Sequence, residues 1–258
     1  MSRKTILITG AAAGIGLAIA RRFALGGYFV GAFDIDAAGV QALRDELGPS
    51  NCHAGTLDVR DRKAWDSAIQ DCEAAAGQSL DVLVNNAGVL DSGPFQDTGI
   101  DSHQRMVDIN VKGVINGCHA AFPHMQGRTD RCIINMASAS AIYGQPALAT
   151  YAATKFAVRG LTEGLNAEWA PHGIRVVDIW PIFVQTAMVD GMKAESIKRM
   201  GVKLSAEDVA EVAWRAAHAG PRSPRVHYPV GRDTHIMGMA VRLMPGWLSR
   251  RVVMHLAT

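Results

Sequence analysis

Short apolar runs alternate with longer segments of helical period along most of this sequence. A strand that is apolar along nearly its whole length is buried on both faces, which is typical of a parallel sheet covered by helices. The intervening helices also favour parallel pairing, because each one carries the chain back to the edge at which the previous strand began. We therefore predict an α/β fold with one doubly wound parallel sheet of about seven strands and helices on both faces.

The apolar runs that we interpret as strands are Lys4–Thr9, Tyr28–Asp34, Cys52–Val59, Asp81–Asn85, Arg131–Ala137, Ile174–Pro181 and Arg225–Val230. The segments with helical period are Ile15–Leu25, Ala37–Leu47, Arg60–Ala76, Ser102–Met125, Ala152–Ala170 and Ala206–Ala219. Residues 187–203 are less regular and follow a strand end. Because ligands of doubly wound sheets bind beyond the carboxyl ends of the strands, we interpret this segment as a substrate lid.

The sequence contains no internal repeat, low-complexity tract or linker, which predicts one catalytic domain over residues 1–230 and a C-terminal tail over residues 231–258. In the tail, Leu248, Val252 and Leu256 recur every fourth residue beside Arg250 and Arg251, as in an amphipathic helix. Such a helix can cover the substrate mouth, pack against a partner subunit or rest on a membrane surface. We favour packing on the domain or on a partner subunit over membrane contact.

Composition argues against several functions. The formal net charge of the 258 residues is only +2, and no run of lysine and arginine suggests nucleic-acid binding. The four cysteines and nine histidines show no metal-binding spacing, so we expect no metal site and the reduced thiols of a cytoplasmic protein. The first predicted strand leaves no room for a targeting peptide, and no run of eighteen apolar residues could span a membrane.

A glycine-rich segment, Thr9–Gly16, follows the first predicted strand and opens the first predicted helix. Glycines at such a junction permit a tight turn and let the backbone approach a pyrophosphate, whose charge faces the helix N-terminus. The spacing of Gly10, Gly14 and Gly16 is G-x-x-x-G-x-G, which differs from the common G-x-G-x-x-G pattern. The alternative is a glycine-rich turn that serves packing alone. The position between strand and helix favours dinucleotide binding.

Asp34 ends the second predicted strand, eighteen residues after Gly16. An acidic side chain there can accept hydrogen bonds from an adenosine ribose, and its charge repels the additional phosphate of NADP. Ala13, Ile35 and Asp36 provide no basic side chain to balance that phosphate. We therefore predict NAD as the cofactor. Asp36 is the alternative ribose ligand.

Tyr151 and Lys155 lie four residues apart in a predicted helix, so their side chains share a face. A neighbouring ammonium favours the phenolate, so we expect Lys155 to lower the pKa of Tyr151 from its ordinary value of about 10. Ser138, thirteen residues before Tyr151, can hold a carbonyl or alcohol oxygen against the phenol. This set suits proton transfer to oxygen. The alternative is a surface aromatic beside a solvated lysine.

Taken in order, these residues resemble the short-chain dehydrogenase/reductase family over roughly residues 4–230. Thr9–Gly16 is similar to its glycine loop, Asp58-Val59 to its adenine-contacting pair, and Asn85-Asn86-Ala87-Gly88 to its fourth-strand signature. Asn110, Ser138, Tyr151 and Lys155 follow the order of its four catalytic residues. The resemblance implies a single Rossmann-type domain.

The same resemblance implies roles for individual residues. Tyr151 would be the acid-base residue, Lys155 would also bind the nicotinamide ribose, and Ser138 would orient the substrate oxygen. Asn110 would kink its helix and position a water that links Lys155 to solvent. The implied cofactor-binding residues are Gly10, Gly14, Ile15, Gly16, Asp34, Asp58, Val59, Asn85, Ala87, Gly88, Tyr151, Lys155, Pro181, Val184 and Thr186.

Some of these residues have simpler interpretations. Asn110 is also compatible with an ordinary helix position and Asn85 with a turn. Ser140 is close enough to replace Ser138 as the orienting hydroxyl. Asp58 could cap the helix that we expect to start near Arg60.

One departure from the family pattern follows the sixth predicted strand. Relatives commonly have Pro-Gly there, whereas this chain has Pro181-Ile182. A branched side chain close to the nicotinamide would change the geometry of this loop. It removes no catalytic group, so the departure leaves the prediction of an enzyme in place.

Flexible methionine and aromatic side chains around the expected lid favour an apolar substrate. The candidate substrate residues are Ser138, Gln145, Phe183, Met188 and Met192, with Met200 nearby. Several of them could instead pack the lid against the domain. We predict hydride transfer between NAD and an apolar secondary alcohol or its ketone. A non-catalytic NAD-binding scaffold or redox sensor is the alternative, and the resemblance implies a homodimer or homotetramer.

Overall fold

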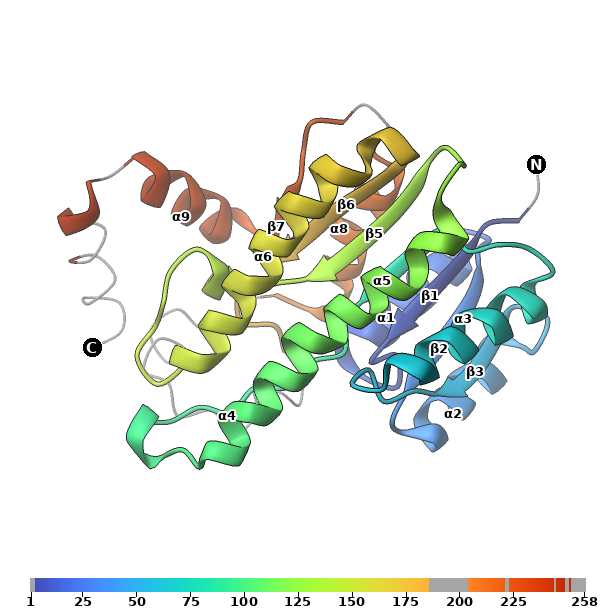
Figure 1. Ribbon diagram of the computed structural model, residues 1–258, viewed down its shortest axis with the longest axis horizontal. Helices are drawn as coiled ribbons and strands as arrows, with labels where there is room; N and C mark the ends of the chain where they lie inside the picture. The colour runs from blue at the N-terminus through green and yellow to red at the C-terminus, as the bar shows by residue number, and fades with distance from the viewer. Residues whose placement is uncertain (1–2, 186–203, 221–222, 244, 249–250, 252–258) are drawn as a thin grey trace.

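A computed structural model of the protein describes residues 3–185, 204–220, 223–243, 245–248 and 251. These residues contain one seven-stranded sheet in which every strand pairs in parallel, in the order β3-β2-β1-β4-β5-β6-β7 (Figure 1). The order reverses between β1 and β4, as in a doubly wound fold. The predicted Rossmann-type fold is confirmed.

The strands are β1 (Thr5–Thr9), β2 (Phe29–Asp34), β3 (Cys52–Thr56), β4 (Val82–Asn85), β5 (Arg131–Met136), β6 (Ile174–Trp180) and β7 (His227–Pro229). The described helices are α1 (Gly14–Leu25), α2 (Ala37–Leu47), α3 (Arg62–Ala76), α4 (Ile100–Val107), α5 (Gly113–Met125), α6 (Ala149–Trp169), α8 (Ala206–His218) and α9 (Arg232–Leu243). A π-helical turn (Asp108–Lys112) joins α4 to α5, and short 3-10 turns cover Phe95–Asp97, Ala139–Ala141 and Ala170–His172.

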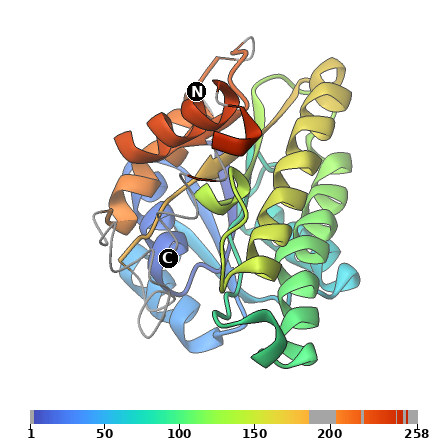
Figure 2. The same ribbon diagram turned by 90° about the vertical axis from the view of Figure 1, so that its left-hand side faces the viewer.

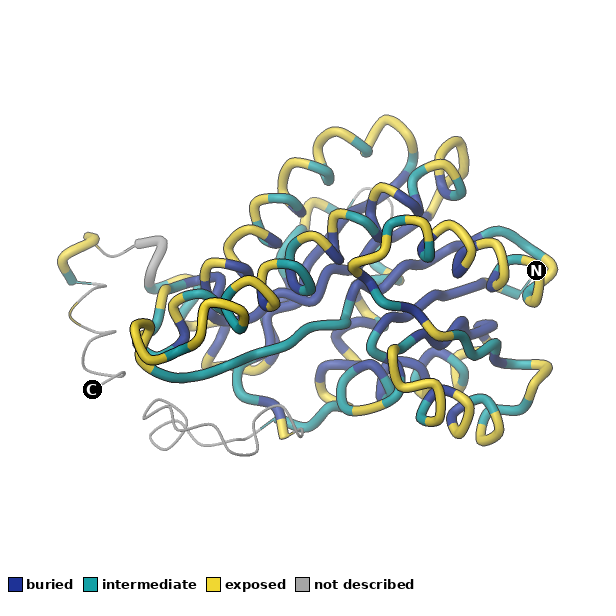
Figure 3. The backbone as a smooth tube through the Cα atoms, turned by 60° about the horizontal axis from the view of Figure 1, so that its bottom comes forward, coloured by how far each residue is buried: buried dark blue, intermediate teal, exposed yellow. Residues whose placement is uncertain are grey.

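The sheet lies between two layers of helices (Figure 2). Side chains of β1 alternate between these layers. Ile6 and Ile8 belong to the first core, under α1, α2 and α8, whereas Leu7 belongs to the second core, under α3, α5 and α6. Figure 3 shows the strands as the most buried part of the chain, with exposed residues on the outer helix faces. Burial on both faces explains the continuous apolar runs of the sequence.

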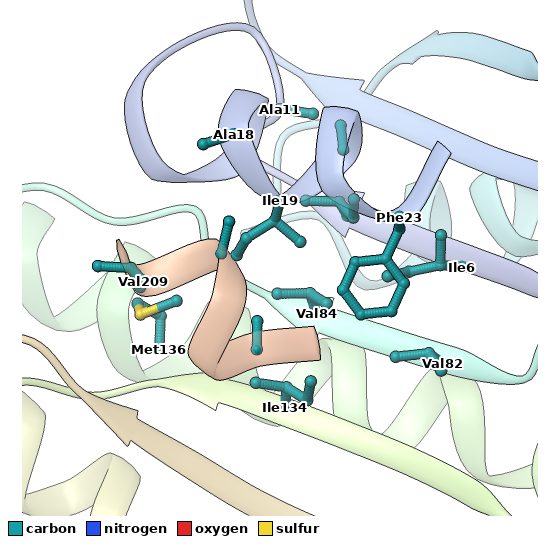
Figure 4. Close-up of a cluster of buried hydrophobic side chains, with 14 of the residues drawn as sticks. Ile6, Ala11, Ala18, Ile19, Phe23, Val82, Val84, Ile134, Met136 and Val209 are labelled. Carbon is teal, nitrogen blue, oxygen red and sulfur yellow. The ribbon is translucent and has the colours of Figure 1, made fainter. Parts of the chain in front are cut away.

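The first core is built around aromatic and branched side chains at the middle of the sheet (Figure 4). Ile19 and Phe23 project from α1 and Val209 projects from α8. They pack over strand residues such as Val84 and Ile134, and all five residues are fully buried. Full burial of side chains of this size contributes roughly 1.5–3 kcal/mol each, so this layer fixes α1 and the loop that precedes it.

Several boundaries differ from the predicted ones. β3 ends at Thr56 rather than Val59, and α3 begins at Arg62 with Asp61 as its N-cap. The interpretation of Asp58 as a helix cap is therefore wrong, because the Asp61 carboxylate accepts from the first-turn amides of Lys63 and Ala64. The predicted helix Ser102–Met125 is divided by the π-helical turn that contains Asn110.

The chain after β7 forms a helix, α9, that the sequence patterns did not reveal. Met237 packs against the second core, and Gly238 lies against Ile142 and Trp180. The start of the predicted tail therefore packs on the domain near the end of β6. Residues 252–258 of the tail lie outside the described residues, as do the predicted lid over residues 187–203 and Thr186, Met188, Met192 and Met200.

The described residues provide neither a membrane-spanning helix nor a cluster of metal ligands. None of the helices in this part of the chain is both long and apolar enough to cross a membrane. Histidine, cysteine and carboxylate side chains in the same residues form no group that could hold a metal ion. The four cysteines are buried free thiols.

Candidate active site

A cavity of about 430 Å³ opens at the carboxyl ends of β1, β2, β4, β5 and β6. This is the edge at which doubly wound sheets bind ligands. Most of the predicted cofactor-binding residues meet here: Gly10, Gly14, Ile15, Asp34, Asp58, Val59, Ala87, Gly88, Tyr151, Lys155 and Pro181. The predicted catalytic pair, Tyr151 and Lys155, thus shares one cavity with the glycine loop and Asp34.

The glycine loop has the geometry of a phosphate cradle. Gly10 and Gly14 have φ angles of +67° and +54°, which side chains with a Cβ rarely adopt. A Cβ on Gly16 would overlap the carbonyl group of Gly10, so Gly16 lets α1 approach the loop. Gly16 itself lies outside the cavity lining. Its role is the packing that shapes the cradle.

The N-terminus of α1 faces this cavity without a side-chain cap. Its N-cap residue, Ala13, offers no hydrogen bond to the first-turn amides, and that turn contains no acidic residue. Uncapped amides and the positive end of the helix dipole suit a diphosphate. The residues present therefore fit a dinucleotide.

Asn86 fastens the glycine loop to β4. Its side-chain amide donates to the carbonyl oxygens of Thr9 at 2.9 Å and Gly10 at 3.2 Å. The Thr9 hydroxyl in turn accepts from the backbone amides of Asn86 and Ala87, both at 3.1 Å. Asn86 also lines the cavity, and we did not predict it as a site residue. Its place in the Asn-Asn-Ala-Gly motif was the available signal.

Asn85, which we did predict as a cofactor-binding residue, points the other way. Successive side chains at a strand end face opposite sides of the sheet. Asn85 is 3% exposed, and its side-chain amide donates to the side-chain oxygen of Asn135 at 2.9 Å and to the Cys118 sulfur at 3.4 Å. Asn85 therefore ties β4 to β5 inside the core and lies outside the cavity lining.

Asp34 is held in place by backbone amides at the end of β2. One carboxylate oxygen accepts from Ala12 at 3.1 Å and the other accepts from Asp36 at 3.1 Å. The alternative ribose ligand, Asp36, instead caps α2 by accepting from Gly39 at 3.0 Å, and it lies outside the cavity lining. The structure therefore favours Asp34 as the carboxylate that a ribose would meet.

Asp58 is paired within the chain. Arg60 donates to both of its carboxylate oxygens, with the shortest distance, 2.6 Å, between Nη2 and Oδ2. This guanidinium lowers the pKa of Asp58. Arg60 and Arg105 both line the cavity, although the sequence patterns had singled out neither residue.

Tyr151 and Lys155 lie one turn apart near the start of α6. The Lys155 ammonium donates to the Met136 carbonyl oxygen at 2.8 Å and lies 5.5 Å from the centre of the Tyr151 ring. Ser138, two residues after β5, is close enough to the phenol to lower its pKa, and its own hydroxyl donates to the Pro181 carbonyl oxygen at 3.5 Å. Ser138 also accepts from the Ser140 amide at 3.1 Å. Ser138, rather than Ser140, is thus the hydroxyl beside the phenol.

The pKa of Tyr151 differs from our expectation. Burial raises it to about 12, and the neighbouring Ser138 hydroxyl only partly opposes this rise. Burial also lowers the pKa of Lys155 to about 8. The predicted lowering of the phenol pKa by Lys155 is therefore wrong for the protein alone, because desolvation disfavours the charged form of each group.

Asn110 lies in the π-helical turn, 1% exposed. Its side chain pairs with the Val89 backbone, donating to the carbonyl and accepting from the amide, both at 2.8 Å. It also donates to the Thr154 hydroxyl at 3.2 Å. Asn110 thereby fixes the chain after β4 against α6, next to Lys155. π-helical turns are rare in proteins, and those that occur are frequently found at functional sites.

The remaining predicted residues are placed less directly. Val184 is 5% exposed and packs in the first core, outside the cavity lining. Ile182, which replaces the usual glycine, packs against the second core. Gln145 and Phe183 are half-buried, and the Gln145 side-chain oxygen is buried with no hydrogen-bond partner among the described residues.

Comparison with known proteins identifies this arrangement. The sequence model of the family described as "short chain dehydrogenase" matches residues 4–196. The chain belongs to this family. As an oxidoreductase of the short-chain dehydrogenase family, it is expected to use a nicotinamide cofactor, which agrees with the fit of its glycine loop to a dinucleotide.

Individual relatives of this short-chain dehydrogenase differ in cofactor and substrate. Oxidoreductase UcpA of Escherichia coli K12 is 40% identical over 224 residues, which cover 86% of this chain and 81% of UcpA. The structure of a 3-ketoacyl-(acyl-carrier-protein) reductase from Brucella melitensis with NADH matches with a TM-score of 0.79 and 32% identity, covering 88% of this chain and 96% of that one. A closed serine dehydrogenase with NADP+ matches with a TM-score of 0.79 and 31% identity, covering 88% and 94%.

Proposed function

We propose that this short-chain dehydrogenase transfers a hydride between NAD(H) and an apolar secondary alcohol or ketone. The observation that carries the proposal is the Tyr151 phenol, which lies with Ser138 beside a cavity that also contains the glycine loop and Asp34. A nicotinamide cofactor, when bound, supplies or accepts the hydride. The protein residues then have to position the substrate oxygen and move one proton.

Tyr151 is the group that moves this proton. Because burial raises its pKa to about 12, the phenol is protonated at neutral pH and is a hydrogen-bond donor to a ketone oxygen. Ser138 shares that oxygen and holds it against the phenol. When an alcohol is oxidised, the phenolate must form, and a protonated Lys155 close by stabilises it.

Lys155 and Asn110 lie close to Tyr151 in the fold and hold the surrounding backbone in position. Lys155 is 5% exposed and is fixed by the Met136 carbonyl, which orients its ammonium toward the Tyr151 side of the cavity. Asn110 fixes the Val89 backbone, and Gly88 lies between Asn110 and Lys155. We propose that these four residues act as the catalytic set.

The preference for NAD rests on Asp34. Its carboxylate lines the cavity, fixed by two backbone amides, where the additional phosphate of NADP would meet a negative charge. Arg60 and Arg105 are the arginines of the cavity lining, and Asp58 already engages Arg60 through both oxygens. The side chains thus favour a ribose diol over a phosphate.

The proposed reaction is tested by Tyr151→Phe with a panel of apolar secondary alcohols and ketones. We expect kcat to fall about 10³-fold, because the proton donor is lost, while the Kd for NADH stays nearly unchanged. Tyr28→Phe is the matched control, since Tyr28 is a buried tyrosine that bonds His218 outside the cavity lining. Unchanged turnover in Tyr151→Phe would rule out the assigned role. NADH binding without turnover of any substrate would favour a non-catalytic NAD-binding scaffold or redox sensor.

The cofactor preference is tested by Asp34→Ser. We expect the ratio of kcat/KM for NAD to that for NADP to fall about tenfold, since a repulsive charge is removed. Asp36→Ser is the matched control, because Asp36 carries the same charge two residues away but caps α2 outside the cavity lining. A wild-type enzyme that prefers NADP would contradict the proposal.

A further inference from the structure

A second cavity, of about 460 Å³, lies at the opposite edge of the sheet from β3. It is formed where the last turn of α8, the edge strand β7 and the first turn of α9 meet (Figure 1). The residues that decide its character are Arg215, Arg225, Tyr228, Arg232 and His235. None of the described residues that line it also lines the cofactor cavity.

Arg225 is fixed in position by three neighbours. Its Nε donates to the His227 carbonyl oxygen at 3.1 Å, and its guanidinium lies 4.7 Å above the centre of the Tyr228 ring. One terminal nitrogen lies 3.3 Å from the His235 ring nitrogen. A guanidinium held in this way loses little further freedom when it binds an anion through its remaining N–H groups.

Two further arginines border the same cavity. Arg215 lies in the last turn of α8, and Arg232 is the first residue of α9. Both residues are exposed, and within the described residues neither side chain takes part in a hydrogen bond or an ion pair, whereas Arg21 and Arg22 pair with glutamates. The N-terminus of α9 adds its positive dipole end to these charges.

The acidic side chains nearest to this cavity do not line it. Glu211 pairs with Arg22 at 2.8 Å, and Asp178 pairs with His227 at 2.7 Å. Asp233, the acidic residue in the first turn of α9, is not part of the cavity lining. The described lining therefore combines three guanidinium groups with no carboxylate.

Tyr228 contributes its ring to the lining, beneath the Arg225 guanidinium. It lines the cavity and is 5% exposed, yet its hydroxyl has no hydrogen-bond partner among the described residues. This hydroxyl has almost no accessible surface, so the Tyr228 ring, rather than the hydroxyl, borders the cavity and holds the Arg225 guanidinium through a cation–π contact.

We propose that this cavity is a binding site for a phosphate group, separate from the cofactor site. Three guanidinium groups around one cavity match a dianion with several acceptor oxygens better than a single carboxylate. Inorganic phosphate and a phosphate monoester present the same group to these residues. The proposal concerns this phosphate group and does not depend on the reaction of the enzyme.

The test is a titration of the full-length protein with inorganic phosphate, followed by ³¹P NMR line broadening at constant ionic strength. It is carried out with saturating NADH, so that the cofactor cavity does not contribute. We expect Arg225→Gln and Arg232→Gln each to weaken phosphate binding about tenfold or more. Arg21→Gln, which removes an exposed arginine on the outer face of α1, is the matched control and should bind phosphate like the wild type.

A parallel titration with ribose 5-phosphate distinguishes the two sources. Tighter binding of the ester assigns the site to a phosphate monoester, and tighter binding of inorganic phosphate assigns it to the free ion. Phosphate binding that is equal in the wild type, Arg225→Gln and Arg232→Gln overturns the proposal. So does dissociation of a wild-type oligomer by Arg225→Gln without a change in phosphate affinity, because the arginines would then serve a subunit contact.

Discussion

The two halves of the carboxyl edge of the sheet are built on different physical principles. In the half formed by β1, β2 and β4, backbone groups and short side chains make the cavity wall. Asn86 and Asp34 satisfy the backbone groups around them with hydrogen bonds of 2.9–3.2 Å. Gly10 and Gly16 bring the loop and α1 into contact. This half is closely fitted and leaves its ligand the free amides of a helix N-terminus.

The half formed by β5, β6 and β7 instead buries groups at an electrostatic cost. Burial raises the pKa of Tyr151 and of Asp178 and lowers the pKa of Lys155, so it favours the neutral form of each group. The buried side-chain oxygen of Gln145 lacks a partner among the described residues. Groups with perturbed pKa values cluster at sites of proton transfer, because removal from water is one way in which such sites adjust the pKa of an acid or a base. The proposed cofactor binding and the proposed proton transfer thus fall in different halves.

A substitution in the first half should have the largest effect, because the cradle has no free space. Gly16→Ala places a Cβ against the Gly10 carbonyl, and backbone cannot rotate away as a side chain can. We expect a loss of stability on the order of 4 kcal/mol and at least a roughly 100-fold weaker Kd for NADH. Urea unfolding and fluorescence titration measure the two quantities.

The matched control for Gly16→Ala is Gly164→Ala. Gly164 lies on an exposed part of α6 with no atom near its missing Cβ, so alanine there should be neutral or stabilising by up to about 1 kcal/mol. Equal effects at Gly16 and Gly164 would show that the first half is not sterically constrained.

The second half should respond next most strongly, at His227. One ring nitrogen lies 2.7 Å from Asp178 and the other 3.0 Å from Glu163, and Trp180 stacks on the ring at 4.6 Å. His227→Leu leaves the fully buried Asp178 carboxylate without this partner, so we expect a loss of about 3 kcal/mol in urea unfolding.

A double variant distinguishes a buried charge from simple packing at His227. In Asp178→Leu with His227→Leu, the carboxylate is gone, so the combined loss should be smaller than the sum of the single losses. Additive losses would show that the pair contributes packing alone and would weaken the contrast between the two halves.

Sequence patterns predicted the parts of the site that depend on local backbone rules. The glycine loop, Asp34 at a strand end, and Tyr151 with Lys155 one helical turn apart all follow from chain geometry over a few residues. For the same reason, the parallel sheet and the position of the cavity at the carboxyl ends of its strands followed once the alternation of strands and helices was recognised.

Properties that depend on tertiary contacts were not predictable in this way. Asn85 and Asn86 are adjacent and chemically identical, and only the strand's orientation decides that Asn86 faces the cavity. The direction of the Tyr151 pKa shift required the depth of burial as well as the neighbour Lys155. α9 contains Gly238, which lowers helix propensity, and the helix is supported by tertiary packing against Ile142 and Trp180.

The smallest effect that we expect is a gain in stability on removing Lys155, whose burial has lowered its pKa from 10.5 to about 8. The difference of about 2.5 units corresponds to roughly 3 kcal/mol, of which about 1 is offset by the bond to the Met136 carbonyl. Lys155→Met should therefore abolish turnover while stabilising the protein by about 2 kcal/mol at pH 7.

The pH dependence gives this prediction its sign. Below pH 8 the amine is protonated in both the folded and the unfolded protein, so the full cost of burying the charge is present. Between pH 8 and 10.5 the unfolded chain binds more protons, and the stability of the wild type rises with pH through this group. The advantage of Lys155→Met should therefore shrink over this range, whereas Lys63→Met, at an exposed lysine of α3, should change little at any pH. A destabilised Lys155→Met protein at pH 7 would mean that the second half does not bury this charge at a cost, and the contrast between the two halves would fail there.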